Sequence, residues 1–321
     1  MRTLTIIVLA ISIISCNKKS FDSVSIWQEF WTYTDQHYIF FKQKEVNWDS
    51  INAIFQPLID ENTEDEELFE KINTAILALK DSHCRIYGLN KIGKTFDFTY
   101  EVANAFDFNL IQNKYLSTDL DSVGQMYISH IGDSIQYVYI KTMNDYAYLH
   151  DILIQLENST YSKLIIDIRN NGGGDSNAIP DLLGTLVNEK TYLGAYIEKS
   201  GPKHQDVTQP LPVYAFPNGH KNHKKIFLLI DDRCYSASSY AAAMMKGLPN
   251  VTLIGAKTSG GGGGNLPYQL SNGWIISVSV SDFLDKEGQS IEKGVSPDIM
   301  VDIDISDFGK TDKVLDTAIN Q

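Results

Sequence analysis

Residues 224–246 read KKIFLLIDDRCYSASSYAAAMMK, an apolar run followed by a short polar turn and an alanine-rich stretch. The run has the length and composition of a buried strand, and the alanines favour a helix. Residues 164–175, LIIDIRNNGGGD, repeat this pattern, with a glycine turn before a helix-like stretch over 177–187. Together with a third apolar run at 251–254, these segments predict parallel strands joined by helices, which is an α/β fold.

Ser236 lies at the junction between the first of these strands and its helix. In a sheet of this kind, binding sites form at the carboxyl ends of the strands. The first N–H groups of a helix have no intrahelical partner, and the helix dipole favours negative charge there. The position therefore suits a nucleophilic hydroxyl. The alternative is that Ser236 or Ser238 only caps the helix, because serine is a preferred N-cap residue.

Two further segments supply the other parts of a site for acyl transfer. The triple glycine at 172–174 lets backbone N–H groups approach a ligand closely, as an oxyanion hole requires. Residues 81–85, DSHCR, follow an amphipathic helical pattern and place His83 in a polar, turn-like setting beside a serine. Serine, imidazole and a glycine-rich donor turn together predict nucleophilic catalysis.

Four blocks, in this order and spacing, resemble the tail-specific, or C-terminal-processing, serine peptidases, a family that includes the tricorn protease core. The blocks are LIIDIRNNGGG at 164–174, SAS at 236–238, LIGAKT at 253–258 and EKGVSPDI at 292–299. The resemblance extends from about Ile26 to Ile303. It implies an α/β fold with a crotonase/ClpP-like ββα spiral core of parallel strands and a small N-terminal helical bundle.

One departure from the family pattern decides which branch the chain resembles. Members with a Ser-Lys dyad carry the lysine where this chain has Gly261, and Lys257 falls at a variable position where a solvated charge is expected. The resemblance therefore implies the tricorn-like branch, in which an early Ser-His pair supplies the base. That pair matches Ser82 and His83, and the late glutamate of the branch falls on Glu292.

The resemblance also implies a role for each of these side chains. Ser236 is expected to be the nucleophile and His83 its general base. Ser82 and Glu292 are expected to orient and polarise the imidazole, as an aspartate does in other triads. For Glu292 the alternative is an exposed carboxylate on a turn. The expected oxyanion donors are the backbone N–H groups of Gly172, Gly173 and Ala237.

The first residues have the features of an export signal. Residues 1–15 carry Arg2 and then an apolar run that is too short to span a membrane, which is typical of a secretory signal peptide. Cys16 follows at the end of this run, an arrangement that resembles a bacterial lipobox. We therefore expect residues 16–25 to form a lipidated terminus and linker that anchors an exported protein in the bacterial cell envelope. Cleavage elsewhere, without a lipid, is the alternative.

The rest of the chain is expected to form a helical cap over 26–82 and an α/β peptidase domain over 83–321. Periodic apolar residues predict the cap helices over 26–41, 47–59 and 63–79. The last of these helices begins with a capping-box pattern that consists of Thr63 and Glu66.

Composition limits the possible partners. The chain has 40 acidic and 27 basic residues and a formal net charge of −13, which argues against nucleic acid as a partner. His220 and His223 have helical ligand spacing but no carboxylate or cysteine nearby, so no metal is expected, and no cofactor either. Cys84 and Cys234 are expected to be free thiols, with a disulfide between them as the alternative.

The function predicted from these features is that of a serine-type endopeptidase that cleaves peptides or unfolded protein tails. Too few residues lie between Cys84 and Met126 for the PDZ module that many relatives insert there. A non-catalytic ligand-binding module on the same fold is the main alternative, and an esterase or amidase is a second. The joint presence of Ser236, His83 and the glycine turn favours catalysis, because a binding module has no need for that set.

Overall fold

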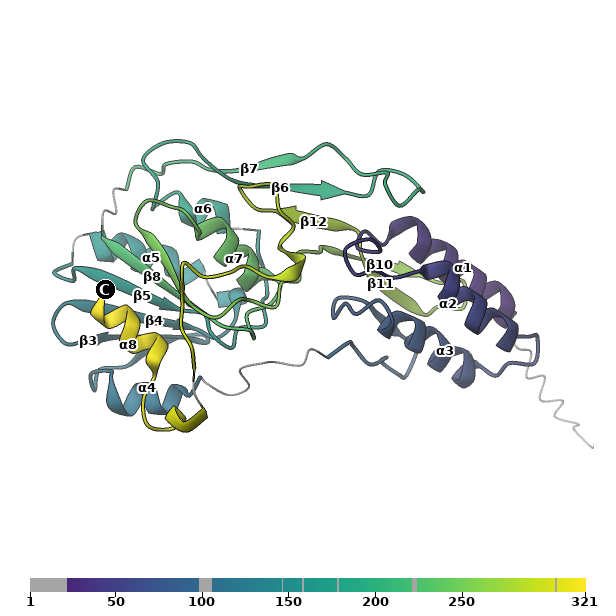
Figure 1. Ribbon diagram of the computed structural model, residues 1–321, viewed down its shortest axis with the longest axis horizontal. Coiled ribbons are helices and arrows are strands. Elements are labelled where there is room, and N and C mark those ends of the chain that lie inside the picture. Colours follow the sequence, from purple (N-terminus) through teal and green to yellow (C-terminus); the bar gives the residue numbers. More distant parts are fainter. Residues whose placement is uncertain are drawn as a thin grey trace, which may run out of the picture.

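A seven-stranded sheet forms the centre of the larger of two lobes in the computed structural model (Figure 1). The structure describes residues 22–97, 106–145, 147–157, 159–177, 179–220, 224–303 and 305–321. The strand order is β13-β9-β8-β5-β4-β3-β2. The strands are β2 (Asp121–Val123), β3 (Met126–Ile131), β4 (Ile135–Ile140), β5 (Lys163–Asp167), β8 (Lys225–Ile230), β9 (Val251–Gly255) and β13 (Ile299–Met300). All neighbours from β13 to β4 are parallel. The predicted α/β class is confirmed, and the three strands predicted as parallel lie side by side.

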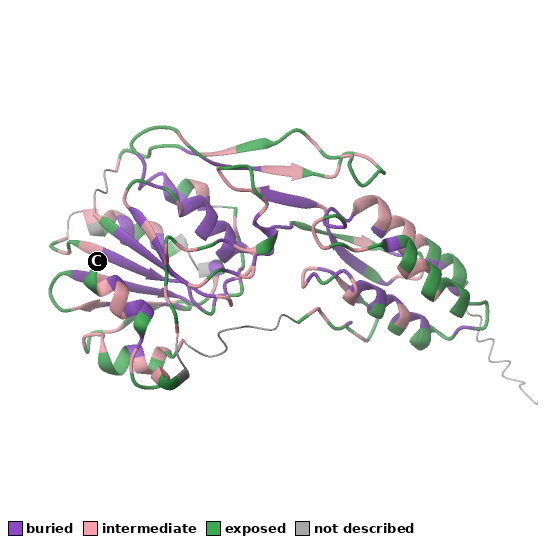
Figure 2. Cartoon of the chain, viewed as in Figure 1, coloured by how far each residue is buried: buried purple, intermediate pink, exposed green. Residues whose placement is uncertain are grey.

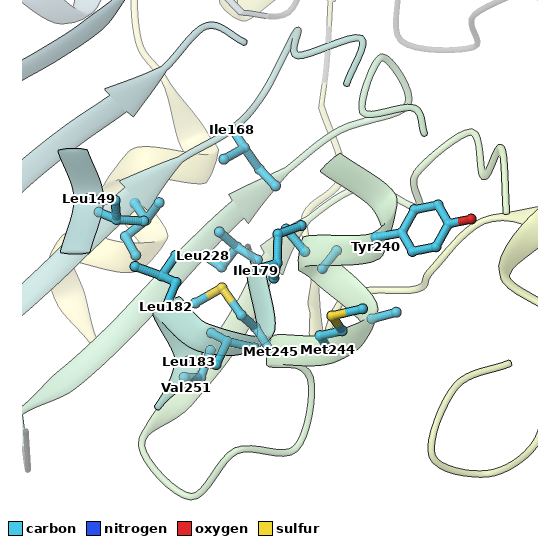
Figure 3. Packing of buried hydrophobic residues seen from close by; sticks show 14 of the residues in the cluster. Leu149, Ile168, Ile179, Leu182, Leu183, Leu228, Tyr240, Met244, Met245 and Val251 are labelled. Carbon is cyan, nitrogen blue, oxygen red and sulfur yellow. The ribbon is translucent and has the colours of Figure 1, made fainter. Parts of the chain in front are cut away.

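Helices cover both faces of this sheet. Helices α5 (Ala147–Glu157), α6 (Ile179–Leu183) and α7 (Ala237–Met245) cover one face, and α4 (Phe108–Lys114) and α8 (Lys313–Asn320) cover the other. Strand side chains alternate between the faces, so Leu228 of β8 packs with α5, α6 and α7, while Phe227 and Leu229 pack with α4 and α8. Figure 3 shows Leu228 in one cluster with Leu182 and Met244. Burial on both faces explains why β8 is a continuous apolar run.

The smaller lobe combines early helices with strands from late in the chain (Figures 1 and 2). Its helices are α1 (Ser23–His37), α2 (Trp48–Phe55) and α3 (Asp65–Leu77), and its sheet, in the order β1-β11-β10, consists of β1 (Arg85–Tyr87), β11 (Ile275–Ser279) and β10 (Asn265–Gln269). Trp27 and Phe30 of α1 share one buried core with Ile276 and Val278 of β11. The expected division into a cap over 26–82 and a separate domain is thus incomplete, because the apolar faces of the helices are buried against strands from the second part of the chain.

The capping-box prediction for the third helix is wrong. Helix α3 begins at Asp65, and its N-cap is Glu64, whose side chain forms no capping bond. The Thr63 hydroxyl instead accepts a hydrogen bond from the Asp60 N–H (2.9 Å), and the Thr63 carbonyl accepts one from the Ser23 hydroxyl (2.8 Å). The contact with Ser23 joins this turn to the first residue of α1, and a local sequence pattern does not reveal such a tertiary contact.

A third sheet connects the two lobes. It has the order β12-β6-β7 and consists of β12 (Ser281–Leu284), β6 (Thr191–Glu198) and β7 (Leu211–Ala215). The ribbon of β6 and β7 extends toward α1 in Figure 1. Near its tip, His204 Nε2 lies 2.7 Å from Asp35 Oδ1, and the His204 ring stacks on Phe41 at a centroid distance of 4.5 Å. Short 3-10 helices occur at Gln56–Leu58 (η1), Met143–Asp145 (η2), Ile291–Lys293 (η3) and Ile305–Asp307 (η4).

The expected signal peptide, Cys16 and the first part of the linker lie outside the described residues. Among the residues that the structure does describe, no helix has both the length and the apolar character needed to cross a bilayer.

A buried ion network fixes the end of β5, directly before the glycine turn. Arg169 Nη2 lies 2.6 Å from Asp167 Oδ2, and Arg169 Nη1 lies 2.8 Å from Asp312 Oδ1. Asp312 also caps α8 by accepting a hydrogen bond from the Leu315 N–H. All three charged side chains are buried, so the network attaches the C-terminal helix to the strand that carries the glycine turn.

Replacing the arginine of this network tests its contribution to stability. Arg169→Met leaves two carboxylates buried without their cation, so we expect the free energy of unfolding to fall by about 3–5 kcal/mol. The measurement is urea unfolding followed by circular dichroism. Glu67→Gln, which removes the exposed pair of Glu67 with Lys71, is the control and should change the value by less than about 0.5 kcal/mol. Equal losses in the two variants would contradict the assignment.

Candidate active site

Ser236 occupies a strained turn between β8 and α7. Its backbone has φ 56° and ψ −124°, in the positive-φ region that non-glycine residues seldom adopt. The conformation is held by the Ser236 N–H, which donates to Gly260 O (2.8 Å), and by the Ser236 carbonyl, which accepts from the Tyr240 N–H (3.0 Å). The Ser236 hydroxyl makes no capping bond to the helix. The capping alternative for Ser236 is therefore not supported, whereas Ser238 donates its hydroxyl to Asn171 O (2.6 Å).

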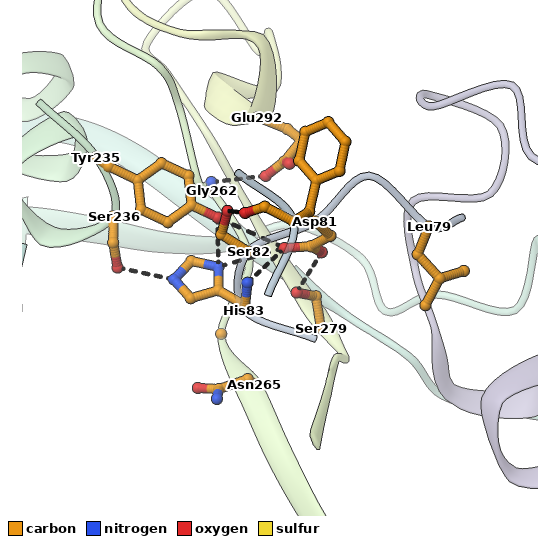
Figure 4. Close-up of polar contacts among 12 residues, drawn as sticks. Leu79, Asp81, Ser82, His83, Tyr235, Ser236, Gly262, Asn265, Ser279 and Glu292 are labelled. Atoms are coloured by element: carbon orange, nitrogen blue, oxygen red, sulfur yellow. Dashed lines mark hydrogen bonds and ion pairs between the residues drawn. The ribbon is translucent and has the colours of Figure 1, made fainter. Parts of the chain in front are cut away.

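His83 reaches Ser236 from the smaller lobe. It lies between α3 and β1, and its Nε2 is 3.0 Å from Ser236 Oγ (Figure 4). The backbone N–H of His83 donates to Asp81 Oδ1 (2.9 Å), which fixes the turn that carries the imidazole. The structure thus brings together the two side chains that the sequence proposed as base and nucleophile.

Two residues that the sequence prediction did not assign lie at the other ring nitrogen of His83. The Tyr235 hydroxyl lies 3.2 Å from His83 Nδ1, and Asp81 Oδ1 lies 3.7 Å from it. The same hydroxyl lies 3.5 Å from Asp81 Oδ1, and Asp81 Oδ2 accepts a hydrogen bond from the Ser279 hydroxyl (2.8 Å). Burial raises the pKa of Tyr235 well above its ordinary value, so the phenol keeps its proton.

The sequence signal that could have identified these two residues is their position beside predicted site residues. Asp81 precedes Ser82 and His83, and Tyr235 directly precedes Ser236.

Ser82 does not contact the imidazole, contrary to the expectation. Its hydroxyl donates to Phe96 O, in the segment that follows β1. The Asp81 carboxylate and the Tyr235 hydroxyl lie beside His83 Nδ1, where Ser82 was expected.

Glu292 is also not a partner of His83. Its Oε2 accepts a hydrogen bond from the Gly262 N–H (2.8 Å), and its Oε1 lies 2.6 Å from Lys44 Nζ. The side chain is buried, so the exposed-turn alternative is wrong as well. Burial and the nearby charge of Asp81 raise the pKa of Glu292 to about 7, while Lys44 lowers it. Glu292 therefore links the Lys44 loop to the glycine-rich segment behind the site.

Burial controls the protonation of His83. It lowers the pKa of the imidazole below its ordinary value, the charge of Lys44 lowers this pKa further, and the charge of Asp81 raises it. Burial dominates because a charged imidazole is poorly solvated there. The ring is therefore neutral at pH 7 and can accept a proton from Ser236.

The three expected oxyanion donors differ in their availability. The Gly173 N–H already donates to Asn171 Oδ1 (2.8 Å), so Gly173 is not a free donor and this expectation is corrected. Its role is close packing, because a Cβ at this glycine would lie 2.9 Å from Ser236 Cβ and 3.0 Å from Ala237 N. Among the described residues, the N–H groups of Gly172 and Ala237 have no hydrogen-bond acceptor, and Gly172 borders open space.

The surroundings of Gly261 leave no room for a lysine at this position. Gly261 has φ 78°, and a Cβ there would lie 2.5 Å from the Tyr235 ring and 2.9 Å from Ser236 N. The Tyr235 ring fills the space beside Ser236, so no side chain fits at residue 261. Lys257 is exposed, as expected.

The remaining polar motifs are structural. Cys84 and Cys234 are free and buried, so the disulfide alternative is not realised. The expectation of no carboxylate near His220 is wrong, because its Nδ1 lies 3.0 Å from Glu157 Oε2, and His223 lies outside the described residues. Within the described ranges, no group of three or more histidine, cysteine, aspartate or glutamate side chains could hold a metal ion.

A comparison with solved structures identifies a close match in fold. The crystal structure of a putative peptidase from Parabacteroides merdae has a TM-score of 0.83 and 28% sequence identity, and the match covers 94% of this chain and 96% of that chain.

Curated proteins match over shorter stretches. A carboxyl-terminal-processing protease of Synechocystis sp. is 26% identical over 186 residues, which is 57% of this chain and 41% of that protein. The nisin-resistance protein of Lactococcus lactis is 28% identical over 153 residues, which is 45% of this chain and 48% of that protein. The aligned parts thus span less than half of the length of these curated relatives.

Two family models match the chain directly. The model of the tricorn protease C1 domain matches residues 25–76, in the smaller lobe, and the model of peptidase family S41 matches residues 134–301, in which Ser236 and the glycine turn lie. The second match covers more than half of the chain and confirms the resemblance that the sequence blocks predicted. The chain belongs to peptidase family S41.

Proposed function

We propose that the protein is a serine endopeptidase with Ser236 as nucleophile and His83 as general base. The observation that carries this proposal is the distance of 3.0 Å between His83 Nε2 and Ser236 Oγ, which is hydrogen-bonding distance for proton transfer. Membership of peptidase family S41 supports the same reaction class.

Each chemical step has a residue in reach. His83 Nε2 accepts the Ser236 proton as Oγ forms a bond to the substrate carbonyl carbon. The N–H groups of Ala237 and Gly172 stabilise the resulting oxyanion, a contribution of about 3 kcal/mol per donor in comparable hydrolases. The protonated imidazole then gives its proton to the leaving amine as the C–N bond breaks. A water molecule, deprotonated by His83, hydrolyses the acyl-enzyme in the same way.

Asp81 and Tyr235 are positioning residues in this mechanism. They contact His83 Nδ1 and leave Nε2 facing the nucleophile. The buried carboxylate of Asp81 stabilises the imidazolium that forms when His83 takes the proton. They thus take the role that the sequence had given to Ser82 and Glu292.

Peptides or unfolded protein tails are the proposed substrates. The Synechocystis relative is described as a carboxyl-terminal-processing protease, which supports this substrate class. The alternative of a non-catalytic binding module is less well supported, because such a module has no need for a neutral histidine in contact with a strained serine.

We also propose that Cys16 carries a lipid and anchors the protein at the bacterial cell envelope. The proposal rests on the short apolar segment that ends at Cys16.

Labelling with a fluorophosphonate probe tests whether Ser236 is the nucleophile. It also tests whether His83 is positioned by Ser82 or by Asp81 and Tyr235. Ser236→Ala should abolish labelling, and His83→Ala should slow it by about 10²- to 10⁴-fold. Ser82→Ala should change the rate less than about threefold, because Ser82 bonds to Phe96 O and not to His83. If folded Ser82→Ala were as slow as His83→Ala, the positioning role assigned to Asp81 and Tyr235 would be wrong.

The pH dependence of kcat/KM reports the base. Since only neutral His83 accepts a proton, activity should rise with pH through an apparent pKa below 6.5, the ordinary value for histidine. The double variant Lys44→Met/Glu292→Gln removes the cation that lowers the pKa of His83 and leaves no unpaired charge in its place. The rise of kcat/KM with pH should therefore occur at higher pH. Asp81→Asn should shift it to lower pH. Shifts of the opposite sign would exclude His83 as the titrating group.

Metabolic labelling with a fatty acid tests the proposed anchor. The full chain expressed in a bacterium should incorporate the label and enter the detergent phase on Triton X-114 separation. Cys16→Ser should do neither, whereas Cys84→Ser, which changes a buried thiol, should behave as the parent protein does. Label retained by Cys16→Ser would contradict the assignment.

A further inference from the structure

An aromatic recess lies beside the candidate active site and has no role in the mechanism described above. It has a volume of about 410 Å³, and four aromatic rings form its walls. The rings are those of Phe106, Phe108, Tyr127 and Tyr139. Lys141 and Asn170 lie at its rim.

The walls of the recess form one packed aromatic group. Tyr139 of β4 is buried, and its ring centroid lies 4.9 Å from that of Phe106 and 4.8 Å from that of Phe108. Phe108 in turn lies 4.9 Å from Tyr127 of β3. The strands and α4 hold these rings in place, so an apolar side chain that enters meets a preformed surface.

Lys141 supplies a charge that is available to a ligand. The residue is exposed, and no carboxylate pairs with it in the part of the chain that the structure describes. The carboxylate of Asp107, which also borders the recess, accepts hydrogen bonds from the Asn109 and Leu110 N–H groups. The Arg169 guanidinium lies over Phe106 at 4.9 Å but is neutralised by Asp167 and Asp312. Among the described residues that line the recess, Lys141 is therefore the cation available to an anionic ligand.

Both rim residues continue directly into the catalytic turn. The two residues that follow Lys141 bind the glycine turn, because the Met143 N–H and the Thr142 hydroxyl donate to Gly173 O at 2.9 and 3.2 Å. Asn170 precedes Asn171, whose carbonyl accepts the Tyr235 N–H (3.2 Å).

The same connections set the distance between the recess and the oxyanion donors. Two Cα–Cα steps separate Asn170 from Gly172, so the rim lies within about 7 Å of the Gly172 backbone. An extended peptide covers this distance in about two or three residues.

We propose that this recess is a substrate-specificity subsite that binds a bulky apolar side chain with a carboxylate next to it. The aromatic walls bury the side chain, and the Lys141 ammonium pairs with the carboxylate. The carboxylate comes either from the free C-terminus of a peptide or from an aspartate or glutamate side chain. This inference rests on the proposed peptidase function and specifies its substrate, because the connection of the recess to the glycine turn matters only if a substrate is cleaved at Ser236.

Peptide binding to the Ser236→Ala protein tests the subsite without cleavage. Fluorescence anisotropy compares three labelled peptides that share one sequence up to a phenylalanine: one ends there as the acid, one ends there as the amide, and one continues with a glutamate whose C-terminus is amidated. The anionic peptides should bind about three- to fivefold more tightly than the amide. The anionic peptide that gains more affinity over the amide identifies the source of the carboxylate. Replacing the phenylalanine by alanine should weaken binding about tenfold or more.

Variants at the rim assign the effect to Lys141. Lys141→Gln should remove the preference for the anionic peptides and leave the amide unchanged. Lys203→Gln, at an exposed position near the tip of the β6–β7 ribbon, is the matched control and should keep the full preference. If neither anionic peptide binds the parent protein more tightly than the amide does, or if the preference persists in Lys141→Gln, the proposal is overturned.

Probe labelling separates this test from that of the peptidase function. In protein that retains Ser236, a small fluorophosphonate offers no carboxylate to Lys141, so Lys141→Gln should label at the parent rate. A slower reaction in Lys141→Gln would show that Lys141 supports the glycine turn instead of the substrate, which overturns the subsite. If the parent protein does not label at all, the proposed catalysis fails, whereas the anisotropy result still decides whether the recess binds these peptides.

Discussion

The contact between His83 and Ser236 joins residues from opposite parts of the chain and from different lobes, and most of the surrounding structure serves to hold it. A hydrogen bond of this kind fails if either lobe shifts by about 1 Å, because proton transfer needs close heavy-atom distances. Asp81 bonds to the His83 N–H and to Ser279 of β11 within the smaller lobe, and its Oδ1 spans the junction by lying 3.5 Å from the Tyr235 hydroxyl of the larger lobe. The buried pair of Lys44 and Glu292 spans it a second time. Polar bonds between lobes therefore determine the geometry of the site, while the two apolar cores stabilise each lobe.

The glycine-rich segment at 260–264 lets the chain pass close behind Ser236. Gly260 accepts the Ser236 N–H through its carbonyl, and a Cβ at Gly260 would lie 2.1 Å from Glu292 O. Two buried carboxylates flank the segment, and burial raises the pKa of both Asp282 and Glu292 to about 7. The positive φ of Ser236 is maintained by this close packing, which compensates for a strained conformation of about 1–3 kcal/mol.

Sequence reasoning predicted the parts of the fold that depend on local pattern. The apolar runs that became β5, β8 and β9 are buried on both faces, and such strands are recognisable from composition alone. Ser236, His83 and the glycine turn were recognisable because each lies at the end of a regular element and matches a family block. The Thr63 capping box failed because a tertiary contact with Ser23 took precedence over the local pattern. Asp81 and Tyr235 were missed, although each lies next to or near a predicted site residue, because none of the four family blocks contains them and their contact joins residues 154 positions apart. The same limit explains the error over Glu292, whose partners Lys44 and Gly262 lie far from it in sequence.

The shared core of the smaller lobe has a consequence for how the protein is made. Helices α1 to α3 are synthesised first, yet the strands that cover them, β10 and β11, are formed by residues 265–279. Ser279, which holds Asp81, is also among the last of these residues to leave the ribosome. A nascent chain therefore has its histidine and its serine long before it has the scaffold that aligns them. Assembly of the site therefore waits for the final quarter of translation, and unfinished copies of the chain have no aligned contact between the two side chains.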